Sequence, residues 1–345
     1  MNLPPVLQVS DLPYAFGKPL VSGQIKQRPS DFIVEEIPGF EPDGHGDHVY
    51  LTIQKTGLTT IAIVDALKRF TGVHAREIGF AGMKDKQAIT TQAFSVNMAG
   101  KEEQNWQKLE NEQIKILSVS RHPRKLKRGV LKGNRFRLRV TDIKGDVQSL
   151  QQSLEQVAQN GVPNFFGEQR FGRDEGNPER AWRMFTQSGF KVKREERSLL
   201  LSSVRSMIFN ALLAKRIELN NWQSLLEGEV INLDGTARHF AEAIDDVLVS
   251  RASEMDVHAT GPLPGQSSRA LEPAGEAGDI EQQLIQTYQP WVDQLVNQGL
   301  EHARRPLRVA VRDMQWQIVD DVLELSFSLT AGAYATVVLR ELVTF

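Results

Sequence analysis

The chain has 345 residues, of which 40% are hydrophobic and 24% are charged, a profile typical of a soluble globular protein with room for two domains. It contains no cysteine, which excludes disulfides, thiolate nucleophiles and cysteine-ligated metal sites. A net charge of -2 gives no overall signal for nucleic acid, so a site for a polyanion has to be a local patch. No apolar run approaches a membrane span and the first residues lack a secretory signal, so the cytoplasm is the expected compartment.

The first seventy residues predict two strands and a helix. Residues 32–36 and 48–53 have strand patterns, and Thr59 is placed to cap a helix that extends to residue 70. Residues 41–48 cluster two histidines with acidic residues, as a metal-binding loop would. Because Pro-Asp-Gly and His-Gly are strong turn signals, we favour a turn over a metal site.

A single carboxylate, Asp85, stands between Lys84 and Lys86 at the join of two predicted strands, residues 78–83 and 89–96. The flanking ammonium groups favour the ionised carboxylate. An ionised carboxylate suits a nucleophile or an electrostatic stabiliser better than a general acid. A solvated Lys-Asp-Lys turn is the alternative that the tripeptide alone would favour.

Residues 121–139 form the clearest basic segment, because they carry nine Lys or Arg residues and no acidic one. A solvated charged face is the alternative, but such faces usually mix both signs. We therefore predict contacts with a phosphate backbone. The side chains expected to make these contacts, here and beside Asp85, are Lys84, Lys86, Arg121, Arg124, Lys125, Lys127, Arg128 and Lys132.

The remainder of the chain predicts a second domain and a return to the first. A helix over 147–160 ends at Asn160-Gly161, where we place a domain boundary. Further elements are expected in the following order: a segment rich in glycine and aromatic residues at 161–173, helices at about 198–219 and 281–298, strands at 309–319 and 322–329, and a closing helix ending at 342.

The run Gly-Phe-Ala-Gly-Met-Lys-Asp-Lys-Gln-Ala-Ile-Thr-Thr-Gln at residues 79–92 resembles the signature of the TruD family of tRNA pseudouridine synthases. Segments at 29–36, 121–136, 162–172 and 331–342 are similar to other segments of that family. The resemblance implies that Asp85 is the catalytic nucleophile and that Lys26 is its positive partner. It also implies substrate contacts from Phe32, from Asn134, and from Tyr334, which would stack on the target base. An amide such as Asn134 offers both a donor and an acceptor to a uracil edge.

The same resemblance implies the fold and the reaction. The fold would be an α+β pseudouridine synthase fold, a mixed and mainly antiparallel sheet with flanking helices, in circularly permuted order. Its catalytic domain would comprise residues 1–160 and 304–345, interrupted by an inserted α/β domain at 161–303. The reaction would convert uridine 13 of tRNA to pseudouridine by base flipping, with no metal, redox cofactor or obligate protein partner. Attack at the sugar C1′ and attack at the base C6 both stay open.

Two other functions are consistent with the same residues. One is a non-catalytic RNA-binding module, which would keep the basic segment and tolerate loss of Asp85. The other is an enzyme that processes glycosides or sugar phosphates, in which Asp85 would act with a second carboxylate such as Glu35 or Glu36.

Overall fold

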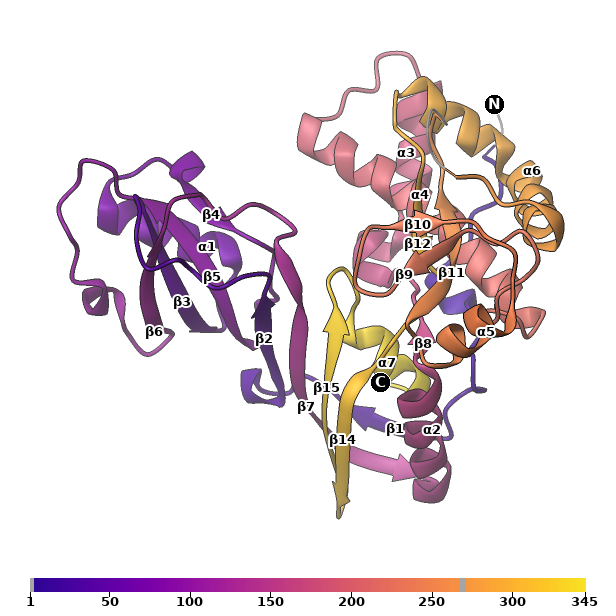
Figure 1. Ribbon diagram of the computed structural model, residues 1–345, viewed down its shortest axis with the longest axis horizontal. Coiled ribbons are helices and arrows are strands. Elements are labelled where there is room, and N and C mark those ends of the chain that lie inside the picture. The colour runs from indigo at the N-terminus through magenta and orange to yellow at the C-terminus, as the bar shows by residue number, and fades with distance from the viewer. Residues whose placement is uncertain (1–2, 267–270) are drawn as a thin grey trace. The chain divides into compact units, whose positions relative to one another are not determined.

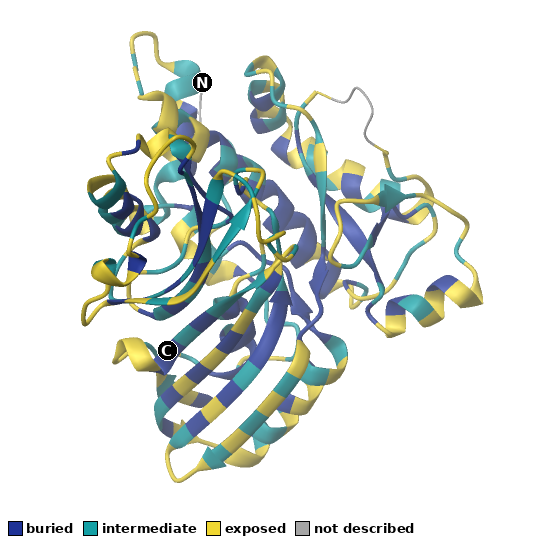
Figure 2. Cartoon of the chain, turned by 60° about the vertical axis from the view of Figure 1, so that its left-hand side comes forward, coloured by how far each residue is buried: buried dark blue, intermediate teal, exposed yellow. Residues whose placement is uncertain are grey.

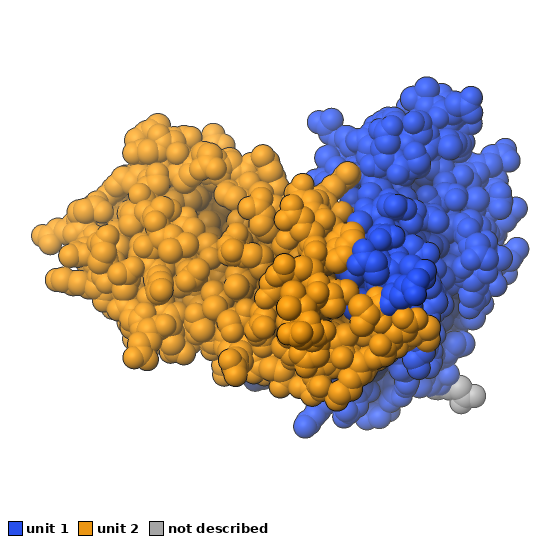
Figure 3. Space-filling model, turned by 90° about the horizontal axis from the view of Figure 1, so that it is seen from below, with its two compact units in different colours: residues 1–19, 148–310, 333–342 blue, residues 20–147, 311–332, 343–345 orange. Residues whose placement is uncertain are grey.

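The computed structural model describes residues 3–266 and 271–345. The chain forms two compact units, each built from segments far apart in sequence (Figure 3). Unit 1 comprises Met1–Pro19, Gln148–Ala310 and Ala333–Leu342, and unit 2 comprises Leu20–Val147, Val311–Gly332 and Val343–Phe345. The predicted domains, 1–160 with 304–345 and 161–303, divide the chain at different positions and stay a prediction.

Unit 2 is built on one large sheet (Figure 1). Its strands are β1 (Val21–Gln24), β2 (Phe32–Pro38), β3 (His48–Thr56), β4 (Ile78–Phe80), β5 (Ile89–Asn97), β6 (Ile114–His122), β7 (Leu131–Gly145), β14 (Arg312–Val319) and β15 (Val322–Thr330). The main order is β14-β15-β7-β2-β5-β3-β6, with β1 beside β7 and β4 beside β5. The C-terminal strand β15 therefore completes a sheet whose other central strands come from the first 145 residues.

The sheet is mixed and mainly antiparallel. Strand β2 pairs in parallel with β5, where Ile33 is opposite Ile89, and antiparallel with β7, where Phe32 is opposite Leu138. Buried and exposed residues alternate along its strands (Figure 2), because successive side chains point to opposite faces. In β7 the apolar residues are buried and the arginines at 135, 137 and 139 are exposed, as the sequence pattern predicts.

Helix α1 (Thr60–Thr71) covers part of one face of this sheet. The Thr59 hydroxyl accepts a hydrogen bond from the Ala62 amide at 3.1 Å, and Gly72 ends the helix in the left-handed conformation with φ of 71°. Ile63 and Leu67 are fully buried against β3 and β5. Burial of such a side chain stabilises a fold by about 1.5 to 3 kcal/mol, so this face fixes the helix on the sheet.

Unit 1 combines helices with two small sheets. Its helices are α2 (Val147–Asn160, in unit 1 from Gln148), α3 (Asn177–Thr186), α4 (Arg194–Glu218), α5 (Asp246–Ser253), α6 (Gly275–Asn297) and α7 (Ala335–Leu342). One sheet has the order β10 (His239–Phe240), β9 (Ile231–Leu233), β11 (Val257–Leu263) and β12 (Ala303–Pro306), and the other pairs β13 (Arg308–Val309) with β8 (Val162–Pro163).

Several element boundaries differ from the sequence prediction. Helix α4 begins at Arg194, four residues before the predicted start at 198, and α6 begins at Gly275 rather than 281. The strand predicted over 78–83 ends at Phe80. Beyond that residue the Gly82 carbonyl accepts a hydrogen bond from the Gln92 side chain, so the chain leaves the strand ladder and enters a loop.

Candidate active site

The loop that joins β4 to β5, residues 81–88, carries Asp85. The Asp85 carboxylate is 2.7 Å from the Lys26 ammonium, and the two side chains are 40% and 14% exposed, respectively. Lys26 follows β1 in the left-handed conformation, with φ of 55°. This sparsely populated backbone conformation carries a cost that concentrates at functional positions. The pair leaves part of an ionised carboxylate open to a ligand.

The ammonium at Asp85 comes from Lys26 and not from either chain neighbour. Lys84 directs its ammonium to the Glu36 carboxylate at 3.0 Å, and both of these side chains are nearly buried. Lys86 is exposed, and its side chain has no ion pair or hydrogen bond within the described part of the chain. The sequence predicts that Lys84 and Lys86 provide the positive charge beside Asp85. In the structure Lys26, which is distant in sequence, provides it.

Beneath the loop lies Lys55, which the sequence analysis missed. Its side chain is fully buried, and its ammonium donates hydrogen bonds to the backbone carbonyls of Asp85 at 3.1 Å and Leu58 at 2.5 Å. Burial lowers the pKa of Lys55 to about 8. A signal was present in the sequence, because Lys55 continues the inward-facing series of β3 that Leu51 and Ile53 define.

Polar side chains fix the backbone of the loop just before Asp85. The Lys84 amide donates to the Thr60 hydroxyl at 2.9 Å, and that hydroxyl donates to the Gln92 side chain at 2.9 Å. The Gln92 amide in turn donates to the Gly82 carbonyl at 3.1 Å. Because α1 and β5 supply these partners, rigid elements determine the position of the nucleophile candidate.

Phe32 lies at the start of β2, next to the ion pair. The Lys26 ammonium is 4.2 Å from the centre of its ring, and the ring packs edge-on against Phe136 at 6.3 Å. Phe32 is only 5% exposed. In this structure its ring therefore acts on Lys26, by a cation–π contact, while its expected contact with substrate stays a prediction.

Asn134 lies on β7, on the sheet face that also carries Glu36. The two residues are directly opposite each other in the β2–β7 pairing, and Leu329 of β15 is opposite Asn134 on the other side. The Asn134 Oδ1 atom is buried and has no hydrogen-bond partner in the described residues. A buried acceptor without a partner is uncommon and is available to a ligand donor. Glu36, the residue opposite Asn134 in the sheet, forms an ion pair with Lys84 of the Asp85 loop.

The basic segment divides into two parts with different surroundings. In residues 121–132, Arg121 contacts Glu103 and the Gly46 carbonyl, Lys125 donates to the Arg76 carbonyl, and Arg128 lies over the Phe80 ring. The side chains of Arg124, Lys127 and Lys132 are exposed and have no ion pair or hydrogen bond within the described residues. These three are the open cations of residues 121–132, and Arg135 of β7 is likewise exposed with no such partner in the described residues.

Two arginines of β7, Arg137 and Arg139, face carboxylates instead. Arg137 lies 2.5 Å from Glu35, and Arg139 lies 3.3 Å from Glu324 and 3.7 Å from Asp31. Neighbouring carboxylates neutralise much of their charge, so this part of the segment is a weaker candidate for phosphate contact.

Tyr334 belongs to unit 1, just before α7. It is 36% exposed, and its hydroxyl accepts a hydrogen bond from Arg170 at 3.0 Å. Of the residues that the sequence predicts for the site, Lys26, Phe32, Asp85 and Asn134 are all in unit 2. That Tyr334 joins them around one substrate stays a prediction.

Residues 3–266 and 271–345 also bear on two other classes of protein, metal-dependent and membrane-spanning ones. No group of three or more His, Asp or Glu side chains in these residues is arranged to hold a metal ion. No helix among them is both long enough and apolar enough to cross a membrane.

Comparisons with known proteins agree over almost the full length. The family model for tRNA pseudouridine synthase D (TruD) matches residues 8–181 and 183–342. The tRNA pseudouridine synthase D of Methylococcus capsulatus is 41% identical over 337 residues, covering 97% of this chain and 95% of that protein. The protein of the same name from Aeromonas hydrophila is 40% identical over 336 residues, covering 97% of this chain and 94% of that protein.

A solved structure supports the fold. The crystal structure of a TruD protein from Methanosarcina mazei is similar with a TM-score of 0.72 and 21% identity, and covers 95% of both chains. The expected fold, a mixed and mainly antiparallel sheet with flanking helices, is confirmed, while the circular permutation and the inserted domain stay predictions. From the matched family model and these full-length relatives, we conclude that the chain belongs to the TruD family of tRNA pseudouridine synthases.

Proposed function

We propose that this chain isomerises uridine 13 of tRNA to pseudouridine, with Asp85 as the nucleophile. The observation that carries the proposal is the Asp85 carboxylate itself, which is partly exposed and paired at 2.7 Å with Lys26. Its loop is anchored by Thr60, Gln92 and Lys55, so it needs little rearrangement to meet a substrate. Membership of the TruD family supports the reaction class.

The reaction exchanges one glycosidic bond for another. The bond between N1 and C1′ breaks, the uracil turns, and C5 forms the new bond to C1′, after which C5 loses its proton and N1 gains one. The Asp85 carboxylate attacks C1′, displacing N1, or adds to C6 of the uracil; in either case the bond to Asp85 breaks again before the product leaves, which regenerates the carboxylate. Lys26 pairs with the carboxylate and orients it until it reacts. The sum of these steps needs no oxidant, reductant or nucleotide.

Recognition of the base follows from the unpartnered acceptor near the loop. The Asn134 Oδ1 atom would accept a hydrogen bond from an uracil N–H, which satisfies a buried atom that has no partner in the described residues. The uridine has to leave its stack to reach Asp85, and Tyr334 would supply a stacking surface for it. The phosphate backbone would be bound by Arg124, Lys127 and Lys132.

The proposed domain organisation accompanies this function. Residues 1–160 and 304–345 would form the catalytic domain, and residues 161–303 the inserted one. The aspartate and the stacking tyrosine would then come from opposite ends of one domain. Because tRNA is the substrate, the enzyme would act where tRNA matures, in the cytoplasm.

The geometry disfavours a glycoside-processing enzyme. Glu35 is engaged by Arg137 and Glu36 by Lys84, so neither carboxylate that could have acted with Asp85 is directed at it. Neither Glu35 nor Glu36 is therefore placed to act as the second acid that paired-carboxylate hydrolysis uses.

The direct test is an assay of the purified protein on unmodified tRNA, without added cofactor. Pseudouridine is tagged chemically and located by mass spectrometry, with a tRNA carrying cytidine at position 13 as the matched control. We expect one tagged nucleotide, at position 13, that is absent from the control. No tagged nucleotide in either tRNA contradicts the reaction, and a tag elsewhere contradicts the position.

A further inference from the structure

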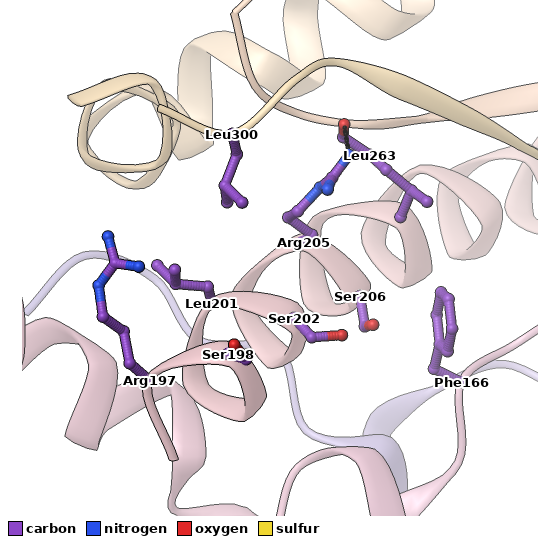
Figure 4. A pocket seen from close by; sticks show the side chains of 9 residues that line it. All are labelled: Phe166, Arg197, Ser198, Leu201, Ser202, Arg205, Ser206, Leu263 and Leu300. Carbon is purple, nitrogen blue, oxygen red and sulfur yellow. Dashed lines mark hydrogen bonds between the residues drawn. The ribbon is translucent and has the colours of Figure 1, made fainter. Parts of the chain in front are cut away.

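A hollow of about 250 Å³ lies in unit 1 against one face of α4 (Figure 4). The helix lines it with two rows of side chains spaced by four residues, so that each row follows one stripe of the helix surface. One row is Arg197, Leu201 and Arg205, and the other is Ser198, Ser202 and Ser206. Phe166 and Leu300 are among the residues that complete the wall, and no carboxylate lines it.

Arg205 brings a poorly compensated positive charge to this hollow. Its guanidinium donates to the Leu263 carbonyl at 2.7 Å and to the Glu301 carbonyl at 3.0 Å. Its Nε–H is buried without an acceptor, and no carboxylate pairs with the side chain in the described residues. Burial lowers the pKa of Arg205. A half-buried cation with one unused buried donor favours an anionic ligand.

A second arginine links the serine row to the aromatic residue of the proposed reaction. Arg170 donates to the Ser202 hydroxyl at 3.0 Å and, through its other terminal nitrogen, to the Tyr334 hydroxyl at 3.0 Å. The Phe166 ring lies 5.3 Å from the Arg170 guanidinium carbon. The hollow and the proposed stacking tyrosine are therefore joined by one side chain within unit 1.

We propose that this hollow binds a nucleotide of the RNA substrate next to the target uridine, holding its phosphodiester and ribose. The inference rests on the proposed function, because Tyr334 marks where the target base would lie. Arg205 and Arg197 would face the phosphate, the serine hydroxyls would bond to phosphate or ribose oxygens, and Phe166 would provide a flat apolar wall. Drug-sized molecules occupy pockets of about 300 Å³ upward, so this smaller hollow suits one nucleotide unit.

The first test fills the hollow without changing its charge. In the full-length protein, Leu300→Trp places a larger ring in the wall, and Leu219→Trp, at the exposed end of α4, is the matched control. We expect the dissociation constant for unmodified tRNA and the KM of pseudouridine formation to rise about tenfold in Leu300→Trp, the loss of one bond to a charged group. The kcat should stay near wild type, and Leu219→Trp should resemble wild type in both.

The second test asks which phosphate the hollow holds. Single methylphosphonates, which remove the charge of one phosphodiester, are placed on either side of the target uridine in turn. At one of these positions the substitution should weaken binding by the wild type and add no further loss in Leu300→Trp, because both changes remove the same contact. If Leu300→Trp loses its fold by circular dichroism, Leu300→Phe, which fills less of the hollow, is measured in its place with the same expectation.

The inference is overturned if the folded variant binds tRNA as tightly as the wild type does. It is also overturned if, at both phosphates, the methylphosphonate weakens binding by Leu300→Trp as much as it weakens binding by the wild type. The two proposals fail separately in these experiments. If the wild type forms no pseudouridine while Leu300→Trp still loses RNA affinity, only the reaction is wrong. If pseudouridine forms and the variant binds normally, only the nucleotide site is wrong.

Discussion

The charged side chains around the Asp85 loop have partners inside the fold, whereas several of those at residues 121–132 are exposed and have none in the described residues. Around the loop, ammonium groups are directed inward, Lys26 to the Asp85 carboxylate and Lys55 to the backbone carbonyl of the same residue. In the basic segment, Arg124, Lys127 and Lys132 remain exposed, with no internal partner in the described residues. The difference indicates two roles. The paired charges position Asp85 for the reaction, and the exposed charges bind the phosphate backbone of the RNA.

Among the variants that keep the Asp85 carboxylate, the largest effect should follow from removing the ammonium beside it. Lys26→Met deletes the partner that lies 2.7 Å from the carboxylate and should lower kcat for pseudouridine formation by about 10² to 10³, as loss of one preorganised electrostatic contact does. The dissociation constant for tRNA should change little. Single-turnover rates and filter binding measure the two quantities.

Lys18→Met, a surface change with no ion pair within the described residues, is the control for the loss of one positive charge. If Lys26→Met retains the wild-type rate, the paired charges have no role in the chemistry.

The exposed charges should act on affinity instead. Changing Arg124 and Lys127 together to Gln should weaken tRNA binding by about tenfold at low salt and reduce the slope of log K against log salt by about one to two. The matched pair, Arg137 and Arg139 changed to Gln, removes the same charge where Glu35 and Glu324 already neutralise it. We expect that pair to leave the salt slope close to wild type.

Affinity measured across a salt series decides between the two pairs. If both double variants show the same slope of log K against log salt, the open cations and the neutralised arginines do not differ in their contact with phosphate.

A prediction of a different kind concerns how the stability of the fold depends on pH through Lys55. Burial lowers the pKa of this ammonium from 10.5 to about 8, so the unfolded chain holds the proton over a pH range in which the folded chain has released it. The contribution to stability is therefore complete above the unfolded pKa and is lost as the pH falls through about 8. Relative to Lys55→Met, the free energy of unfolding of the wild type should rise by about 2 kcal/mol from pH 7 to pH 9.5.

Urea unfolding of both proteins at the two pH values measures this difference. If the free energy of unfolding of the wild type relative to Lys55→Met stays constant or falls as the pH rises, the pKa of Lys55 is not lowered by folding.

Local signals in the sequence predicted much of the fold. Thr59 and Gly72 define the two ends of α1 because capping depends on neighbouring residues. The alternation around Phe136 and Leu138 predicts which face of β7 is buried. The start of α4 was missed because nothing in residues 194–197 distinguishes a first helical turn from a charged loop, and contacts with other parts of unit 1 decide it.

The site was predicted less completely, because its partners meet across the sheet. Asp85 stands out in its own motif, but its pairing with Lys26 came from a family resemblance and not from spacing. The ion pair between Lys84 and Glu36 depends on β2 lying beside β5, which no local pattern reveals. The same is true of the hollow on α4, where Arg205 finds its carbonyl partners on segments about 60 and 100 residues further along the chain.

The central claim is that the Asp85 carboxylate is the nucleophile that attacks the target uridine. Asp85→Asn keeps the size and shape of the side chain and removes its charge, so single-turnover pseudouridine formation by this variant, measured beside its tRNA affinity, tests the claim most directly. We predict tRNA binding within about twofold of wild type and a rate at least about 10³ lower, as expected when a nucleophile is removed. Pseudouridine formed by Asp85→Asn at the wild-type rate would contradict the account.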